Sequence, residues 1–283
     1  MRWTPGGTSD NIEDRRGEGG GGGGGLRLPG GRLGLGMMAV LLVGSLLFKR
    51  NLFTLLDQGA GGGTTNGPVQ SSAQEDSLVQ FVSVVLDSAQ ADWARVLPAA
   101  GTPFHPAKLV LFRGAVNSGC GQAESAMGPF YCPADEKVYI DLGFYQELRD
   151  RFGAPGDFAQ AYVLAHELGH HVQKLLGTEE RMRRLQQSDP GRENEYSVKL
   201  ELQADCYAGV WAHEADREGM LDGGDVQEGM TAAAAVGDDR LQKEAGQAVN
   251  PEGFTHGTSA QRTEWFHRGF EHGDIRSCDT FGQ

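Results

Sequence analysis

The spacing of apolar residues divides the chain into a short block of strands and a longer run of helices. A helix is predicted from Asp76, because apolar side chains recur there at steps of three and four positions. Residues 108–113 read as a strand, and residues 130–132 and 137–141 flank the turn 133–136 as a hairpin. Beyond the hairpin the pattern is helical nearly to the end. Strands followed by helices predict an α+β fold, mainly helical with a small sheet.

The most clearly predicted helix carries the sequence His166-Glu167-Leu168-Gly169-His170. Asp157 is a suitable N-cap for this helix and Gly177 is a suitable C-cap. Between them, apolar residues recur at helical spacing and form one long face. They are Phe158, Ala161, Ala165, Leu168, Val172 and Leu175. Another helix is predicted from Glu193 to Glu218.

The N-terminal part of the chain has a different composition. Residues 1–32 are Gly-rich, charged and poor in large apolar side chains, which predicts a disordered tail. Residues 33–53 contain a long uncharged run and are predicted to form a transmembrane anchor. A cleaved signal peptide and a buried helix are the alternatives; the long preceding segment disfavours the first. Residues 54–75 read as a flexible linker, and residues 76–283 as the folded domain.

Charge and cysteine content indicate the compartment and the partners. More basic residues precede the predicted anchor than follow it, which favours a catalytic domain on the periplasmic or extracellular side of the membrane. The net charge of -13 argues against nucleic-acid binding, because phosphate contacts need clustered Lys and Arg. The sequence does not indicate the oligomeric state.

The four cysteines contain no Cys-x-x-Cys pair, so they are predicted to form disulfides rather than a zinc finger. They are Cys120, Cys132, Cys206 and Cys278. Cys120 and Cys132 can close a short loop, and Cys206 and Cys278 would then tie a helix to the C-terminal tail. Three connectivities are possible.

The spacing of His166 and His170 predicts a metal site. Residues four apart on a helix project from the same side, so both imidazoles can meet one zinc ion. Glu167 lies beside them, where it can accept a proton from a water molecule that the metal activates. His171 is interpreted as a neighbour of the site and not as a ligand. Two surface histidines on an amphipathic helix are the alternative.

A catalytic zinc needs a third protein ligand. Glu201 and Asp205 are four apart on the next predicted helix. Glu201 is predicted to be the third ligand, and Asp205 to accept the outer N–H of a ligating histidine. A cysteine ligand and a merely solvated pair of carboxylates are the alternatives.

The pair of motifs resembles the gluzincin arrangement, in which the third ligand is a glutamate. Further motifs resemble the bacterial neutral zinc metallopeptidase family over nearly the whole chain. They lie at residues 1–3, 9–16, 128–133, 157–160, 237–242 and 254–259. The resemblance implies a zincin-like metallopeptidase domain, one Zn²⁺ per chain, a single transmembrane helix before the domain, and peptidase chemistry.

Residues 255–262 resemble a further element of the prenyl-endopeptidase gluzincins, although Gly257 replaces their proline. By that resemblance, His256 donates a hydrogen bond to the developing oxyanion and Arg262 braces the site. The alternative is that His256 only caps the following helix.

These observations predict a membrane-anchored zinc endopeptidase with a protein or peptide substrate, in which Glu167 is the general base. Residues 138–141 are a candidate strand for pairing with an extended substrate. A catalytically silent zinc-binding interaction module and a hydrolase of non-peptide, cell-wall amides are the alternatives.

Overall fold

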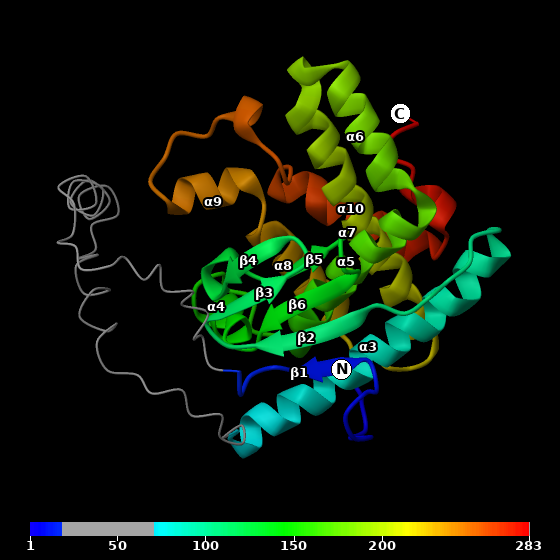
Figure 1. Cartoon of the computed structure of the whole chain (residues 1–283), viewed down its shortest axis with the longest axis vertical. Helices are drawn as coiled ribbons and strands as arrows, with labels where there is room; N and C mark the ends of the chain where they lie inside the picture. Colours follow the sequence, from blue (N-terminus) through cyan, green and yellow to red (C-terminus); the bar gives the residue numbers. More distant parts are fainter. Residues whose placement is uncertain (19–70, 283) are drawn as a thin grey trace, which may run out of the picture.

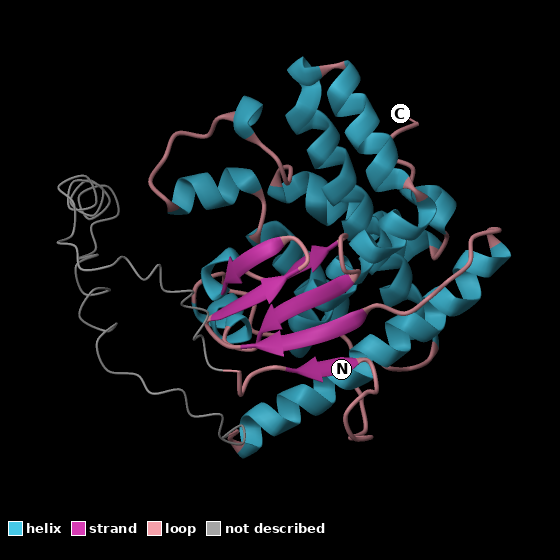
Figure 2. Cartoon of the chain, viewed as in Figure 1, coloured by secondary structure: helices cyan, strands magenta, loops and turns pink. Residues whose placement is uncertain are grey.

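The computed structural model describes residues 1–18 and 71–282. Within them the chain forms a mainly helical α+β domain with a small sheet (Figures 1 and 2). The strands are β1 (Ile12–Asp14), β2 (Lys108–Phe112), β3 (Ala115–Ser118), β4 (Gly121–Glu124), β5 (Phe130–Cys132) and β6 (Lys137–Asp141). The helices are α3 (Ala73–Ala99), α4 (Phe144–Asp150), α5 (Asp157–Leu176), α6 (Thr178–Ser188), α7 (Glu193–Arg217), α8 (Asp225–Ala235), α9 (Asp238–Glu244) and α10 (Ser259–His272).

Four strands form the main sheet, in the order β1-β2-β6-β5. Strand β2 is parallel to both β1 and β6, whereas β5 and β6 are antiparallel, as expected for the predicted hairpin. Strand β6 is therefore paired with β2 along its whole length and with β5 at residues 137–139. The prediction that residues 138–141 pair with a substrate is wrong for Val138 and Tyr139, because both edges of the strand are occupied there. Strand β5 ends the sheet on that side.

Side chains alternate between the two faces of the sheet. On one face, Leu109 and Leu111 of β2 join Val138 and Ile140 of β6 in the large core under α3 and α5. On the other face, Val110 and Phe112 pack with residues of the β3–β4 hairpin. The sheet is thus buried on both sides, which explains why β2 is a continuous apolar run.

Helix α5 runs from Asp157 to Leu176 and begins as predicted, except that Gly156 is the N-cap and Asp157 the first helical residue. It ends at Gly177, which has a φ of 74°. This left-handed conformation is one that glycine adopts without strain. The predicted C-cap is confirmed.

Glycine and alanine let three helices approach closely where they carry the polar residues described below. A Cβ atom on Gly209 of α7 would lie 2.0 Å from the carbonyl oxygen of Phe266 in α10. A Cβ on Gly169 of α5 would lie 3.0 Å from the carbonyl oxygen of Ala204 in α7. The backbones of α5 and α10 are therefore both held against α7.

Two disulfides join Cys120 to Cys132 and Cys206 to Cys278. Of the three connectivities, the local pairing is the one that forms. The first disulfide links the β3–β4 hairpin to strand β5. The second ties α7 to the short C-terminal turn η5 (Ile275–Cys278), and both of its cysteines are fully buried.

Residues 1–18 are part of the domain, in contrast to the disordered tail expected for residues 1–32. Strand β1 pairs with β2, and Trp3 packs edge-on against Phe81 of α3 at 5.6 Å between ring centroids. The backbone nitrogen of Met1 lies 3.0 Å from the carboxylate of Asp157, at the start of α5. A few specific contacts thus order a segment whose composition alone suggested disorder.

The predicted transmembrane helix also needs a correction. No helix within residues 1–18 and 71–282 is long and apolar enough to cross a membrane. The longest, α3, carries charged residues such as Asp87 and Asp92 along its length. A transmembrane helix before the domain is therefore not supported, and the segment 33–53 that was predicted to form it lies outside the described residues.

The contact at Gly209 gives a test of the helix packing. We expect Gly209→Ala to lower the free energy of unfolding by roughly 3 kcal/mol, because the added methyl overlaps the α10 backbone and must push the helices apart. Denaturant unfolding measures the change. Gly223→Ala is the matched control, since a Cβ there meets no atom within 4 Å. Equal stability of the two variants would contradict this packing.

Candidate metal centre

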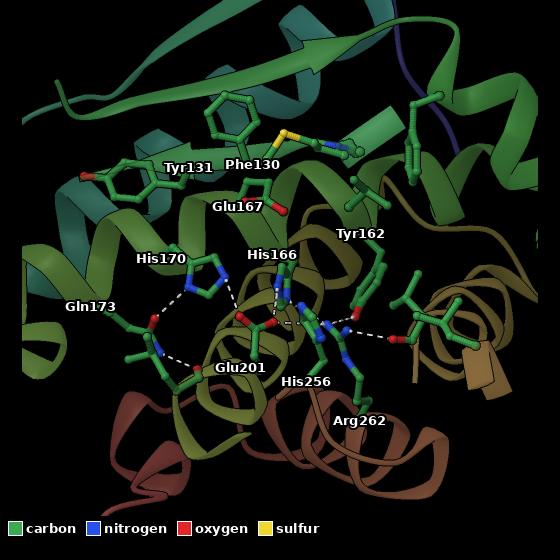
Figure 3. A pocket seen from close by; sticks show the side chains of 18 of the residues that line it. Phe130, Tyr131, Tyr162, His166, Glu167, His170, Gln173, Glu201, His256 and Arg262 are labelled. Carbon is green, nitrogen blue, oxygen red and sulfur yellow. Dashed lines mark hydrogen bonds and ion pairs between the residues drawn. The ribbon is translucent and has the colours of Figure 1, made fainter. Parts of the chain in front are cut away.

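Helices α5 and α7 bring His166, His170 and Glu201 together. The Nε2 atom of His166 lies 3.3 Å from Glu201 Oε2, and the Nε2 atom of His170 lies 3.5 Å from Glu201 Oε1. One nitrogen or oxygen atom from each residue lies within 4.8 Å of the others, and Figure 3 shows the three side chains converging. The structure thus places together the three residues that the sequence predicted as ligands.

The donor set suits zinc. Two imidazoles and one carboxylate are a ligand combination found at catalytic zinc sites. Burial raises the pKa of Glu201, but the neighbouring His170, His166 and Arg262 outweigh it and hold that pKa well below its ordinary value. Glu201 is therefore a carboxylate, the form that binds metal.

The outer nitrogen of His166 faces a buried polar cluster. Its Nδ1–H donates to Asp205 Oδ1 at 2.9 Å, and the Tyr162 hydroxyl donates to the same oxygen. Arg262 donates to both oxygens of Asp205, from Nε at 2.8 Å and from Nη2 at 2.9 Å. Since a carboxylate can only accept, His166 carries its proton on Nδ1 and turns Nε2 toward Glu201.

Electrostatics in this cluster follow from burial and pairing. Burial raises the pKa of Asp205, but Arg262 and His166 outweigh that effect and lower it. Burial lowers the pKa of His166, yet Asp205 and Glu201 raise it to about 10. The negative charge that holds a proton on His166 equally favours a divalent cation at Nε2.

His171 points away from this site. Its Nε2–H donates to the backbone carbonyl of His105 at 2.8 Å, and its Nδ1 lies 3.0 Å from the hydroxyl of Tyr131, which donates to it. Burial lowers the pKa of His171. Both nitrogens of this neutral ring are thus occupied, in agreement with its interpretation as a neighbour and not a ligand.

The candidate ligands lie at the base of a cleft of about 710 Å³. Glu167 lines the cleft beside the histidines, and the edge strand β5 runs above them with Phe130 and Tyr131 (Figure 3). Much of the remaining lining is apolar. It includes Met127, Phe144, Phe152, Val163, Met182 and Leu241.

His256 lies at the side of the cleft in the loop before α10. Its Nδ1–H donates to Asp238 Oδ1 at 3.1 Å, and Asp238 Oδ2 accepts from the backbone N–H groups of residues 255–257. The hydrogen bond that His256 donates to Asp238 raises the pKa of His256, and burial opposes this with a smaller effect. The N-cap of α10 is Thr258, so His256 does not cap this helix.

Sequence reasoning missed three residues of the site. Tyr162 lies one turn before His166 on α5, and Gln173 lies one turn after His170, where its Oε1 accepts from His170 Nδ1–H at 2.9 Å. Asp238 holds the loop of His256. The helical positions of Tyr162 and Gln173, on the same side as the histidines, were the available signal.

The chain has relatives among known proteins over most or all of its length. The chain is 48% identical to "Uncharacterized protein YpfJ" of Escherichia coli K12 over 287 residues, which covers 100% of this chain and 99% of that relative. It is 46% identical to "Uncharacterized protein Rv2575" of Mycobacterium tuberculosis H37Rv over 206 residues, or 69% of this chain and 68% of the relative. No solved structure matches the chain significantly.

One family model spans almost all of the sequence. It matches residues 1–281 and carries the description "Putative neutral zinc metallopeptidase". The match includes β1, the helices that carry the candidate ligands, and the C-terminal disulfide. The chain therefore belongs to this family of zinc metallopeptidases.

Proposed function

We propose that the protein is a zinc-dependent endopeptidase whose single Zn²⁺ is held by His166, His170 and Glu201. The observation that carries the proposal is the convergence of these three side chains at the base of an open cleft, with Glu167 beside them. A zinc ion in this position supplies a Lewis acid that polarises a carbonyl and lowers the pKa of a water molecule.

Glu167 is the proposed general base. It follows His166 directly in the helix and lines the cleft, so its carboxylate can reach a water molecule near the ligands. It accepts the proton of the attacking water and delivers it to the nitrogen that leaves when the peptide bond breaks. Only 8% of the surface of Glu167 is exposed, but the residue is part of the cleft lining.

The shape and lining of the cleft support an extended peptide as substrate. Strand β5 ends the sheet beside the cleft, so one of its edges is not used by the sheet. A peptide can add to such an edge through main-chain hydrogen bonds. The apolar lining favours a substrate with apolar side chains near the bond that is cleaved.

His256 and Arg262 have different proposed roles. His256 faces the cleft and is held by Asp238, so it can donate a hydrogen bond to the oxyanion that develops on the substrate carbonyl. Arg262 is bonded to Asp205, and its role is to brace the ligand His166 through that carboxylate.

The two other candidate functions have less support. A silent zinc-binding module does not need a carboxylate like Glu167 facing a large cleft. Hydrolysis of a non-peptide amide uses the same chemistry, but the edge strand β5 favours a polypeptide. The two disulfides support an oxidising compartment for the domain.

Replacement of Glu167 tests the catalytic proposal. We expect Glu167→Gln to lower kcat for peptide cleavage by roughly 10²- to 10⁴-fold, because the amide cannot accept a proton. Zinc content should stay unchanged, since Glu167 is not a ligand. Peptide-library digestion with metal analysis measures both. Glu147→Gln makes the same change elsewhere in the cleft and should leave cleavage intact; undiminished activity of Glu167→Gln with zinc bound would refute the assignment.

The role of His256 predicts a loss confined to the chemical step. We expect His256→Ala to lower kcat roughly 10²-fold, through loss of one oxyanion donor, with little change in KM or zinc affinity. Steady-state kinetics on one peptide measures this split. His267→Ala is the control, because His267 is similarly exposed but lies on α10 outside the cleft. A variant with normal kcat would assign His256 to the loop structure alone.

Replacement of Asp205 should change both the zinc affinity and the stability of the protein. We expect Asp205→Asn to weaken zinc binding about 10- to 100-fold, because His166 loses its carboxylate partner. It should also lower the free energy of unfolding by about 3–5 kcal/mol, since buried Arg262 then keeps only the more distant carboxylate of Glu201, 3.9 Å away. Chelator competition and denaturant unfolding measure the two effects. Asp216→Asn is the control, because Asp216 is an exposed residue on the same helix. Unaltered zinc affinity of the Asp205→Asn variant would count against this role of Asp205.

A further inference from the structure

Gln173 is almost fully buried, with 1% of its surface exposed, and it lies one turn after His170 on α5. We propose that Gln173 is a positioning residue that holds the ring of His170 with the Nε2 lone pair turned toward the metal site. The proposal rests on the zinc site proposed above. It concerns how one ligand is held and not which residues are ligands.

The orientation of the Gln173 amide is set by a backbone carbonyl. The Nε2 atom of Gln173 lies 2.6 Å from the carbonyl oxygen of Leu200 on α7. A carbonyl oxygen can only accept a hydrogen bond, so the side-chain atom facing it must be the NH₂ group. The amide oxygen of Gln173 must then face the opposite way, toward His170.

This orientation determines the protonation of His170. Gln173 Oε1 lies 2.9 Å from His170 Nδ1, and an amide oxygen can only accept. His170 therefore donates from Nδ1, and its lone pair is on Nε2, which lies 3.5 Å from Glu201 Oε1 (Figure 3). That nitrogen is the one that can bind a metal ion. A rotated amide would present a donor to Nδ1 and favour the wrong tautomer.

The side-chain amide of Gln203 holds the side-chain amide of Gln173 in place. The other hydrogen of the Gln173 NH₂ group is donated to Gln203 Oε1 at 3.2 Å, and Gln203 Nε2 donates to the carbonyl of Cys278 at 2.9 Å. Again a backbone carbonyl can only accept, so the orientation of Gln203 is determined too. Cys278 is itself bonded to Cys206 of α7. The chain of hydrogen bonds thus runs from the C-terminal turn to the ligand.

The two histidines are consequently held by different chemistry. His166 donates to a carboxylate, whereas His170 donates to a neutral amide. An amide suits position 173, because the side chain must accept from His170 and also donate to Leu200 and Gln203. A carboxylate can meet the first requirement but not the second.

The alternative role for Gln173 is purely structural: it would then be only a buried polar link between α5 and α7. The two roles differ in what a substitution does. A purely structural link would affect stability, whereas a positioning residue affects zinc affinity and the environment of the bound metal. Gln173→Glu separates them, because it keeps the acceptor for His170 and loses both donors to α7.

The experiment uses the full-length protein and measures Zn²⁺ affinity by chelator competition. We expect Gln173→Met, which is similar in size but cannot accept from His170, to weaken zinc binding about 10- to 100-fold. The Co²⁺-substituted variant should show an altered visible absorption spectrum. Gln173→Glu should stay nearer to wild type in both measurements. Gln160→Met, the same change on α5 outside the cleft, is the control and should match wild type.

The results distinguish this inference from the proposed function. Wild-type protein that binds no zinc would refute the zinc site as a whole. Wild-type affinity in Gln173→Met would refute only the role of Gln173. Equal losses in Gln173→Glu and Gln173→Met would also refute it, because the acceptor would then be irrelevant. If Gln173→Met does not fold, Gln173→Glu still decides, since an affinity far below wild type in that folded variant contradicts the proposal.

Discussion

The buried ion pair of Asp205 and Arg262 is the interaction on which the candidate site depends. Both side chains are almost completely removed from water, which is unfavourable for charges unless each is paired and hydrogen-bonded. Asp205 meets that requirement with Arg262, Tyr162 and His166 together. These partners come from α5 and α10, so neither helix can move relative to α7 without exposing an unpaired charge. The packing of α5 and α10 against α7 therefore also fixes the geometry of the candidate ligands.

The close contacts between these helices help to fix the same geometry. Arg262 can reach Asp205 only because α7 and α10 touch at Gly209 and Gly269. Glu201 can approach the two histidines because α5 and α7 touch at Gly169. Small residues at these crossings bring polar groups within hydrogen-bonding distance, and the polar groups in turn hold the crossings together. Substitution of a small residue at a crossing should therefore disturb the polar groups, and loss of a polar group should weaken the helix packing.

The sequence predicted the parts of the site that follow from helical periodicity. His166 and His170, and likewise Glu201 and Asp205, are each four residues apart, and such pairs lie on one side of a helix whatever the rest of the fold does. The hairpin of β5 and β6 was also predicted, because its strands are adjacent in sequence. The roles of these side chains in catalysis stay predictions.

Features that depend on contacts between distant segments were not predicted. Strand β1 contains a single apolar residue, Ile12, and its partner β2 lies far along the chain, so no local pattern indicates the pairing. The function of Gln173 depends on the carbonyl of Leu200, which belongs to another helix. Asp238 likewise holds a loop that follows it by many residues. Each of these contacts joins segments that are far apart in the sequence, so only the folded structure reveals it.

The pairing of β1 also changes how the chain is divided. Arg16 Nη1, just after β1, lies 3.2 Å from Glu75 Oε1 in the first turn of α3. This ion pair joins the end of the described N-terminal segment to the start of the second described segment. Residues 1–18 and 71–282 therefore build one domain together. A fragment that starts at α3 would lose an edge strand and leave the backbone of β2 uncovered.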